Sequence, residues 1–147
     1  MFRNTLLLVM LIGAGGMSAA QANEPGQYEI LKQHLLAGQR TTSILQLDKC
    51  EQTSGSKIGM KGLTGGFVIP SFMNVQEPSE AILYSDDHST VHDDLPVHEF
   101  LRYRVAADQT AIITTKVFSS KTFEAIGETR IFKCKLGEGL TFSYQPD

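Results

Sequence analysis

Residues 84–105 read YSDDHSTVHDDLPVHEFLRYRV, and the rest of the chain is arranged around this stretch. Its last part, Glu99 to Val105, alternates apolar and polar residues, which predicts a strand with Leu101 and Tyr103 turned toward a core. Its first part is rich in histidine and aspartate, and we interpret it as a loop that joins this strand to another beginning at Ala81. The stretch therefore predicts antiparallel β structure that carries a strongly polar loop.

The first 22 residues have the pattern of a cleaved secretory signal peptide. Arg3 supplies a positive start, residues 6–14 are apolar, and Ala20-Gln21-Ala22 has the small-x-small form of a cleavage site. The apolar run is too short for a membrane-spanning helix, which needs about 20 residues. We therefore expect one mature domain, residues 23–147, that is periplasmic or secreted and keeps no membrane contact after cleavage.

Charge and cysteine content narrow the class of protein. The formal net charge is -3, which argues against a nucleic-acid partner because such proteins present basic surfaces. Cys50 and Cys134 are the two cysteines, and in an oxidising compartment such a pair is more often bonded than free. We expect a disulfide that stabilises the fold by roughly 4–5 kcal/mol on the chain-entropy model.

The other segments predict one helix and several short strands. Tyr28, Leu31 and Leu35 have helical spacing, with Asn23 as the cap and Gly38 as the end. Strands are predicted at residues 41–47, 67–75, 81–84, 99–105, 111–118, 132–136 and 140–144. We expect a mainly β fold, a strongly bent antiparallel sheet or small barrel of about six or seven strands with one N-terminal helix, and an α+β open sheet as the alternative.

Two hairpins have predicted registers. A three-residue loop at 108–110 places Val105 opposite Ile113 and keeps one continuous apolar face. A glycine-containing loop later in the chain pairs residues 132–136 with residues 140–144 in one sheet.

The central stretch first suggests a metal site. His88, His92 and His98 lie close together in the sequence and are interleaved with carboxylates. Imidazole and carboxylate are ligands that suit zinc or copper. The hypothesis competes with a solvated acidic loop that binds no metal.

Hydrolytic catalysis is a second hypothesis for the same stretch. Serine, histidine and aspartate are present, but no nucleophile motif such as G-x-S-x-G accompanies them. The pairs Asp86-Asp87 and Asp93-Asp94 could serve as acid and base, although adjacent carboxylates on a loop are usually surface charge. We expect no enzymatic activity and no cofactor.

Arg102 and Arg104 carry the interpretation that we favour. They project from the polar face of one strand, and a guanidinium can fork onto a carboxylate. The expected partners are Asp86, Asp87, Asp93 and Asp94. At least one such contact would pin the loop for display, whereas free arginines would form a site for an anion or a partner protein.

Four segments occur in an order that is typical of one family. They are GGFVIPSF (65–72), ILYSDDHSTV (82–91), PVHEFLRYRV (96–105) and FKCKLGEGLTF (132–142). With these segments and its cysteine pair, the chain resembles the VirK family of small exported bacterial proteins over nearly the whole mature region. The resemblance implies a periplasmic or secreted protein associated with virulence or host contact, without an assigned reaction.

We therefore expect an exported, non-enzymatic protein that binds a partner protein or a small anionic molecule. A metal-binding periplasmic protein is the alternative. A small-ligand carrier would need a cavity among five aromatic residues, which the pattern favours as ordinary core. They are Phe67, Phe72, Tyr103, Phe132 and Phe142.

Overall fold

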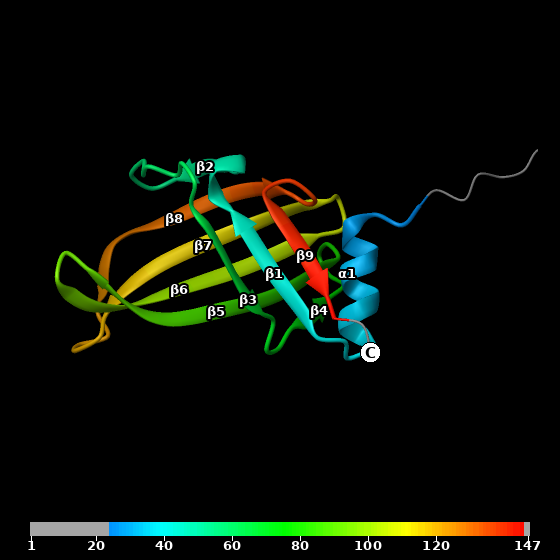
Figure 1. The fold of residues 1–147 in the computed structure, drawn as a ribbon, viewed down its shortest axis with the longest axis horizontal. Helices are drawn as coiled ribbons and strands as arrows, with labels where there is room; N and C mark the ends of the chain where they lie inside the picture. The colour runs from blue at the N-terminus through cyan, green and yellow to red at the C-terminus, as the bar shows by residue number, and fades with distance from the viewer. Residues whose placement is uncertain (1–23, 146–147) are drawn as a thin grey trace, which may run out of the picture.

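The structure is a computed structural model that describes residues 24–145. The predicted signal peptide and Asn23 lie outside the described residues. The elements in chain order are α1 (Gln27–Leu36), β1 (Thr41–Gln46), the short 3-10 helix η1 (Leu47–Lys49), β2 (Glu51–Ser54), β3 (Thr64–Val68), β4 (Met73–Val75), β5 (Ala81–His92), β6 (Leu95–Ala106), β7 (Thr110–Ser119), β8 (Ala125–Lys135) and β9 (Leu140–Tyr144) (Figure 1).

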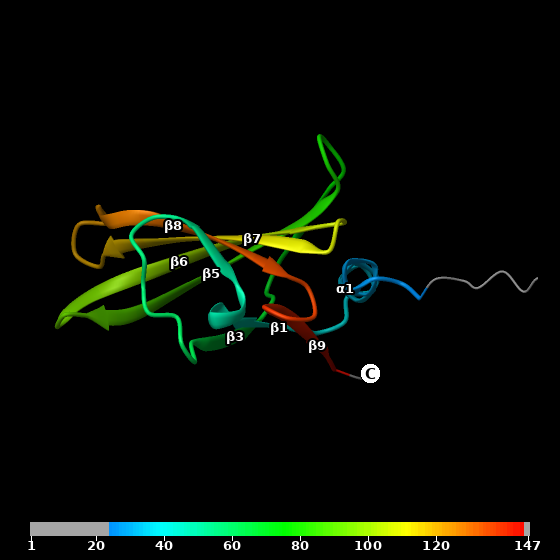
Figure 2. The same cartoon turned by 90° about the horizontal axis from the view of Figure 1, so that it is seen from above.

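The strands form two antiparallel sheets that pack in two layers (Figure 2). The small sheet has the order β3-β1-β9, and the large sheet has the order β2-β8-β7-β6-β5-β4. The mainly β prediction with one N-terminal helix is confirmed. Among the described residues the sheets stay open and do not close into a barrel.

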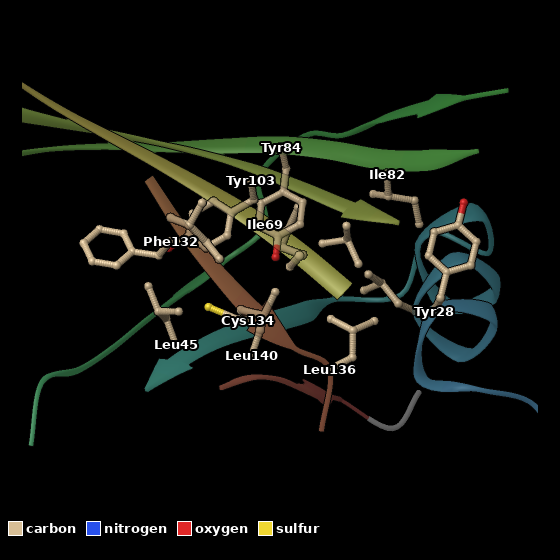
Figure 3. Close-up of a cluster of buried hydrophobic side chains, with 14 of the residues drawn as sticks. Tyr28, Leu45, Ile69, Ile82, Tyr84, Tyr103, Phe132, Cys134, Leu136 and Leu140 are labelled. Atoms are coloured by element: carbon tan, nitrogen blue, oxygen red, sulfur yellow. The ribbon is translucent and has the colours of Figure 1, made fainter. Parts of the chain in front are cut away.

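The core lies between the two sheets and is closed at one end by α1 (Figure 3). Tyr28 and Leu31 of α1 are fully buried, as the helical spacing predicted. Tyr84 of β5 stacks on Tyr103 of β6 with ring centroids 4.8 Å apart, and its hydroxyl lies 3.0 Å from the Ser43 hydroxyl of the small sheet. Burial of each large apolar side chain contributes about 1.5–3 kcal/mol, and the tyrosine hydroxyl in this core keeps a hydrogen-bond partner.

The N-terminus of α1 begins after Gly26 and contacts the β6–β7 turn. Gly26 is the N-cap residue and offers no side-chain bond. Instead, the backbone N–H of Tyr28 donates to Gln109 Oε1 at 3.2 Å. Lys32 forms an ion pair with Glu80, just before β5, and this bond holds the pKa of the Glu80 carboxyl below its usual value. The helix is thereby attached to the large sheet at two points.

The predicted register of β6 and β7 is wrong by two residues. Val105 pairs with Ala111, and Tyr103 pairs with Ile113. Gln109, with φ 66°, supplies the left-handed turn position that usually takes glycine. Because the error is an even number of residues, each side chain stays on its predicted face.

The predicted pairing of residues 132–136 with 140–144 is also wrong. Beyond one bridge between Leu136 and Leu140, the chain leaves the large sheet, and β9 pairs with β1 in the small sheet. Two alternating apolar strands can face each other across two layers as well as pair within one sheet. Similarly, the predicted strand 67–75 is divided around Pro70 into β3 and β4, which belong to different sheets.

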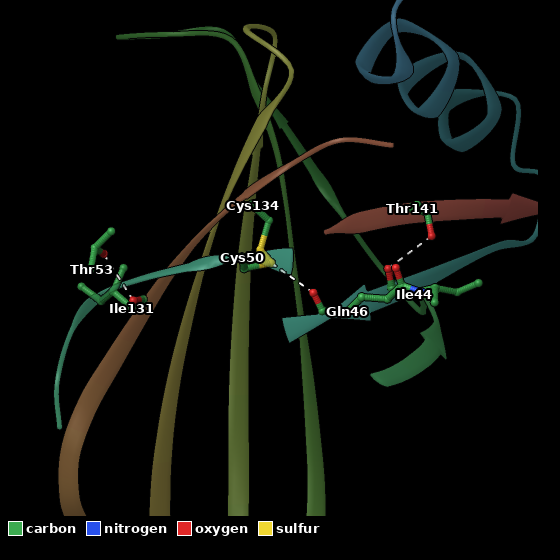
Figure 4. Close-up of a disulfide and its surroundings, with 7 residues drawn as sticks. All are labelled: Ile44, Gln46, Cys50, Thr53, Ile131, Cys134 and Thr141. Carbon is green, nitrogen blue, oxygen red and sulfur yellow. Dashed lines mark hydrogen bonds between the residues drawn. A yellow bond between two sulfur atoms is a disulfide. The ribbon is translucent and has the colours of Figure 1, made fainter. Parts of the chain in front are cut away.

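The cysteine pair joins the residue before the edge strand β2 to the neighbouring strand β8 (Figure 4). The Sγ atoms of Cys50 and Cys134 lie at disulfide distance, 2.07 Å, and close a loop with a sequence separation of 84. Gly139 lies against this pair, since a Cβ built there would be 2.6 Å from Cys50 Sγ. The start of β2 is therefore tied to β8 next to the turn that leads into β9.

Candidate functional site

The large sheet extends beyond the small one, on the side away from α1 (Figure 1). Strands β5 and β6 have 12 residues each, whereas β1 has six and β3 and β9 have five. The small sheet therefore covers only part of the inner face, the face of the large sheet that is turned toward it. The uncovered part is the candidate functional site.

Two adjoining hollows of about 630 and 450 Å³ form a cleft on this inner face. Both are lined by Leu47, Leu63, Glu99 and Leu101. We call this the inner-face cleft. Each hollow has a volume within the range of about 300–1,000 Å³ that is typical of small-molecule sites.

Three aromatic residues that were expected to form ordinary core also line the cleft. They are Phe67, Tyr103 and Phe132. Burial, and then the nearby charge of Asp86, raise the pKa of Tyr103 above its usual range. The wall of the cleft therefore keeps a neutral phenol beside a carboxylate.

A chain of ionisable side chains runs along the polar floor of the cleft. Asp86, His88 and His92 alternate on β5 and so share the inner face, and His88 is the register partner of Glu99 on β6. His88 contacts Asp86 through Nδ1 at 3.3 Å and Glu99 through Nε2 at 3.1 Å. His92 Nε2 lies 3.1 Å from the other oxygen of Glu99. One carboxylate is thus held between two imidazoles.

His98 lies on the opposite, outer face of the large sheet. Its ring stacks on Phe123 with centroids 5.5 Å apart, and its Nδ1 lies 3.5 Å from Asp87. The predicted metal site of His88, His92 and His98 is therefore not formed, because neighbouring positions of a strand alternate between its two faces. In residues 24–145 no group of three or more histidine, cysteine or acidic residues is arranged to hold a metal ion.

The outer face also places a serine, a histidine and an aspartate together. Ser89 Oγ lies 3.4 Å from His98 Nδ1, the same nitrogen that contacts Asp87. In a catalytic triad the serine and the acid contact different nitrogens of the imidazole. This exposed group therefore lacks the geometry for nucleophilic catalysis.

Arg102 and Arg104 project from the outer face, as the alternation predicted, but they do not bind the aspartates. Arg104 donates to the hydroxyl of Ser79 at 2.5 Å and to its carbonyl oxygen at 3.3 Å. Among the ion pairs of the described residues, neither arginine has a carboxylate partner. The expected pinning contact is not formed. The polar stretch up to His92 is part of strand β5, and its pairing with β6 holds it in place.

Asp93 and Asp94 form the turn between β5 and β6. Their φ angles are 47° and 62°, so both are in the left-handed region. A two-residue turn of this kind matches the twist of the flanking strands, and aspartate tolerates its backbone better than most residues. The two carboxylates are exposed and shape the hairpin, whereas Asp86 and Asp87 lie on opposite faces.

Arg130 is the cleft residue that the sequence interpretation missed. It lies on β8 opposite Thr115 of β7, and both line the cleft. The sequence pattern could have predicted this position. Arg130, Phe132 and Cys134 are two residues apart along one strand, so the arginine must share the face of the two buried residues. The predicted strand began at residue 132, so the alternation was not extended to residue 130.

The glycine-containing loop after β2 is ordered by Gln52. This buried side chain donates through Nε2 to the carbonyl oxygens of Ser54, Gly55 and Ser56 at 3.2, 3.2 and 2.8 Å. Glu128 of β8 accepts from the backbone N–H of Ser56 at 2.8 Å. The loop is thus attached to the large sheet and carries one wall of the cleft.

Known proteins resemble the chain over most of its length. The family model described as VirK protein matches residues 24–123, which is more than half of the chain. The chain belongs to the VirK family. The family resemblance inferred from the four sequence segments is therefore confirmed.

Two relatives of this VirK family chain are described as uncharacterized proteins. It is 28% identical over 137 residues to the uncharacterized protein y4wH of Sinorhizobium fredii, with 92% of each chain covered. It is 24% identical over 140 residues to an uncharacterized protein encoded in the pinF2 3' region of Rhizobium radiobacter, with 95% of this chain and 94% of that protein covered.

A solved structure shares the fold. The crystal structure of a VirK family protein from Legionella pneumophila matches with a TM-score of 0.70 at 20% identity, covering 81% of this chain and 97% of that one. At this identity the match shows the common fold alone.

No helix within residues 24–145 has the length and apolar character needed to cross a membrane.

Proposed function

We propose that this VirK family protein is exported and acts by non-catalytic binding, with the inner-face cleft as its binding site. The observation that carries the proposal is the uncovered inner face, where apolar walls surround a few fixed polar groups. Such a combination is typical of ligand sites. Three apolar side chains here remain about half exposed or more: Leu95 (60%) and Ile126 (42%) on the inner face, and Leu63 (45%), which lines the cleft from just before β3.

Two features of the chain support export. The N-terminal residues have the signal-peptide pattern. A cysteine pair at disulfide distance is typical of proteins in oxidising compartments. Cell fractionation followed by N-terminal sequencing tests this part: we expect a periplasmic or secreted protein that starts at Asn23, and retention of the full chain in the cytoplasm would contradict it.

The side-chain contacts in the cleft support binding without catalysis. The ring contacts of His88 and His92 are made with carboxylates, whereas an activated nucleophile needs a hydroxyl or thiol within hydrogen-bond reach of its base. The family resemblance adds the proposal that binding serves host contact. A host-association assay with a strain that lacks the protein tests this addition, and unchanged association would contradict it.

Native mass spectrometry of the protein purified from its own bacterium tests the binding site. We expect a small molecule to be retained by the wild type and lost from Leu63→Asp, which places a charge at the rim of the cleft. Phe123→Asp is the matched control, because Phe123 is 69% exposed on the outer face. Equal retention by both variants, or no retained molecule, would contradict cleft binding.

A further inference from the structure

The polar side chains of the inner-face cleft differ in whether they have partners within the protein. Both carboxylates of its floor already have partners, since Asp86 contacts His88 and each oxygen of Glu99 contacts an imidazole. Arg130 has no ion pair within the described part of the chain, and its Nε is buried without a hydrogen-bond partner. Buried polar groups are normally satisfied. Arg130 can therefore donate a hydrogen bond to a negatively charged acceptor that enters the cleft.

The position of Arg130 is constrained by its surroundings. A Cβ built at Gly55, whose φ is 84°, would lie 2.8 Å from Arg130 Cγ. The aliphatic stem of the arginine therefore packs directly against the loop backbone, where only glycine leaves room. Phe132 follows two positions later on the same face. Arg130 therefore lines the cleft together with Phe132, and its stem is held against the ordered loop.

We propose that the inner-face cleft binds a small amphipathic carboxylate. The carboxylate group accepts hydrogen bonds from Arg130, and the apolar body lies against Leu47, Leu63 and Leu101. This inference rests on the proposed function and names the ligand class of the same site. The planar guanidinium matches a carboxylate with two parallel hydrogen bonds, and the hollow next to Arg130, about 450 Å³, has room for a short acyl chain or a ring.

Isothermal titration calorimetry with octanoate tests the charge preference. Octanol keeps the chain without the charge, and acetate keeps the charge without the chain. We expect octanoate to bind the exported protein more tightly than octanol or acetate does. Arg130→Gln should weaken octanoate binding roughly tenfold to a hundredfold, because hydrogen bonds to charged groups are worth about that much.

Arg102→Gln is the matched control, since it removes a guanidinium from the outer face of the same sheet and should leave octanoate affinity unchanged. Urea denaturation of both variants checks that they fold. Equal affinities for octanoate and octanol, or equal affinities of wild type and Arg130→Gln for octanoate, would overturn the ligand class while cleft binding stands. Failure of all three probes to bind would likewise overturn the ligand class. Cleft binding itself is tested separately, by whether the native mass spectra show a retained molecule.

Discussion

Replacing Gly139 with alanine tests how tightly the cysteine pair is packed. The added Cβ would lie 2.6 Å from Cys50 Sγ, 3.2 Å from Cys134 Cβ and 3.2 Å from the Lys49 carbonyl oxygen. Ordinary contacts of a Cβ begin at 3.4 Å. Cys50 Sγ would have to move away by about 0.8 Å. It is bonded to Cys134, which is 1% exposed and packed on all sides, so there is little room for this movement.

We expect Gly139→Ala to lower the free energy of unfolding by about 1–3 kcal/mol, as overpacking of a filled core does. Urea denaturation followed by circular dichroism measures this change. Gly65→Ala is the control, because no heavy atom lies within 4 Å of a Cβ at that position. The control should be neutral or stabilise by up to about 1 kcal/mol.

A variant without the two cysteines separates the clash with the sulfur from the other effects of the added Cβ. With Cys50 and Cys134 both replaced by alanine, the closest clash is absent, and Gly139→Ala should cost less than in the wild type by about 0.5 kcal/mol or more. Wild-type stability of Gly139→Ala would refute the packing of this turn. So would an equal loss in both backgrounds.

Three further results are expected. Mass spectrometry of non-reduced protein should find no alkylatable thiol, and reduction should lower the free energy of unfolding by roughly 4–5 kcal/mol; two free thiols would contradict this. Burial raises the pKa of Tyr28 and of Tyr144 from 10.0 to about 12. The stability that these two side chains contribute should therefore be complete below pH 10 and decline as the pH rises from 10 to 12. Phenolate absorbance that appears near pH 10 in the folded protein would contradict this expectation. Arg102→Met and Arg104→Met should each cost under about 1 kcal/mol in urea denaturation, and a loss near 3 kcal/mol would reveal an ion pair that the structure lacks.

Alternation along the strands made much of the fold predictable. Leu101, Tyr103 and Val105 share the inner face as expected, and even the wrong register of β6 and β7 kept that face, because a shift of two residues preserves parity. The helical stripe of α1 was equally clear. Both inferences depend on local periodicity, which a single sequence displays directly.

The sheet to which each strand belongs was not predictable in the same way. Strand β9 has apolar residues that would fit β8 in one sheet, but it pairs with β1 instead. Nothing local distinguishes these arrangements, because the choice depends on how two layers cover each other. The same limit applies to Pro70, where the chain leaves one sheet for the other.

The candidate site was predicted in part. His88, His92 and Asp86 were recognised as a polar group, but the stretch was read as a loop, so His98 was added to the same cluster. A polar sequence can be a strand when its neighbours in the sheet provide pairing, as β6 does here. Extending the alternation through residues 86–92 separates the two faces and leaves His98 outside the site.

The position at which an amphipathic carboxylate binds decides whether the inner-face cleft is the binding site. Methyl chemical shifts recorded during an octanoate titration report this position. We predict that the methyl signals of Leu63 and Leu101, which line the inner-face cleft, shift together, and that those of Leu83, on the outer face, stay constant. Shifts at Leu83 without shifts at Leu63 and Leu101 would contradict the inner-face cleft as the binding site.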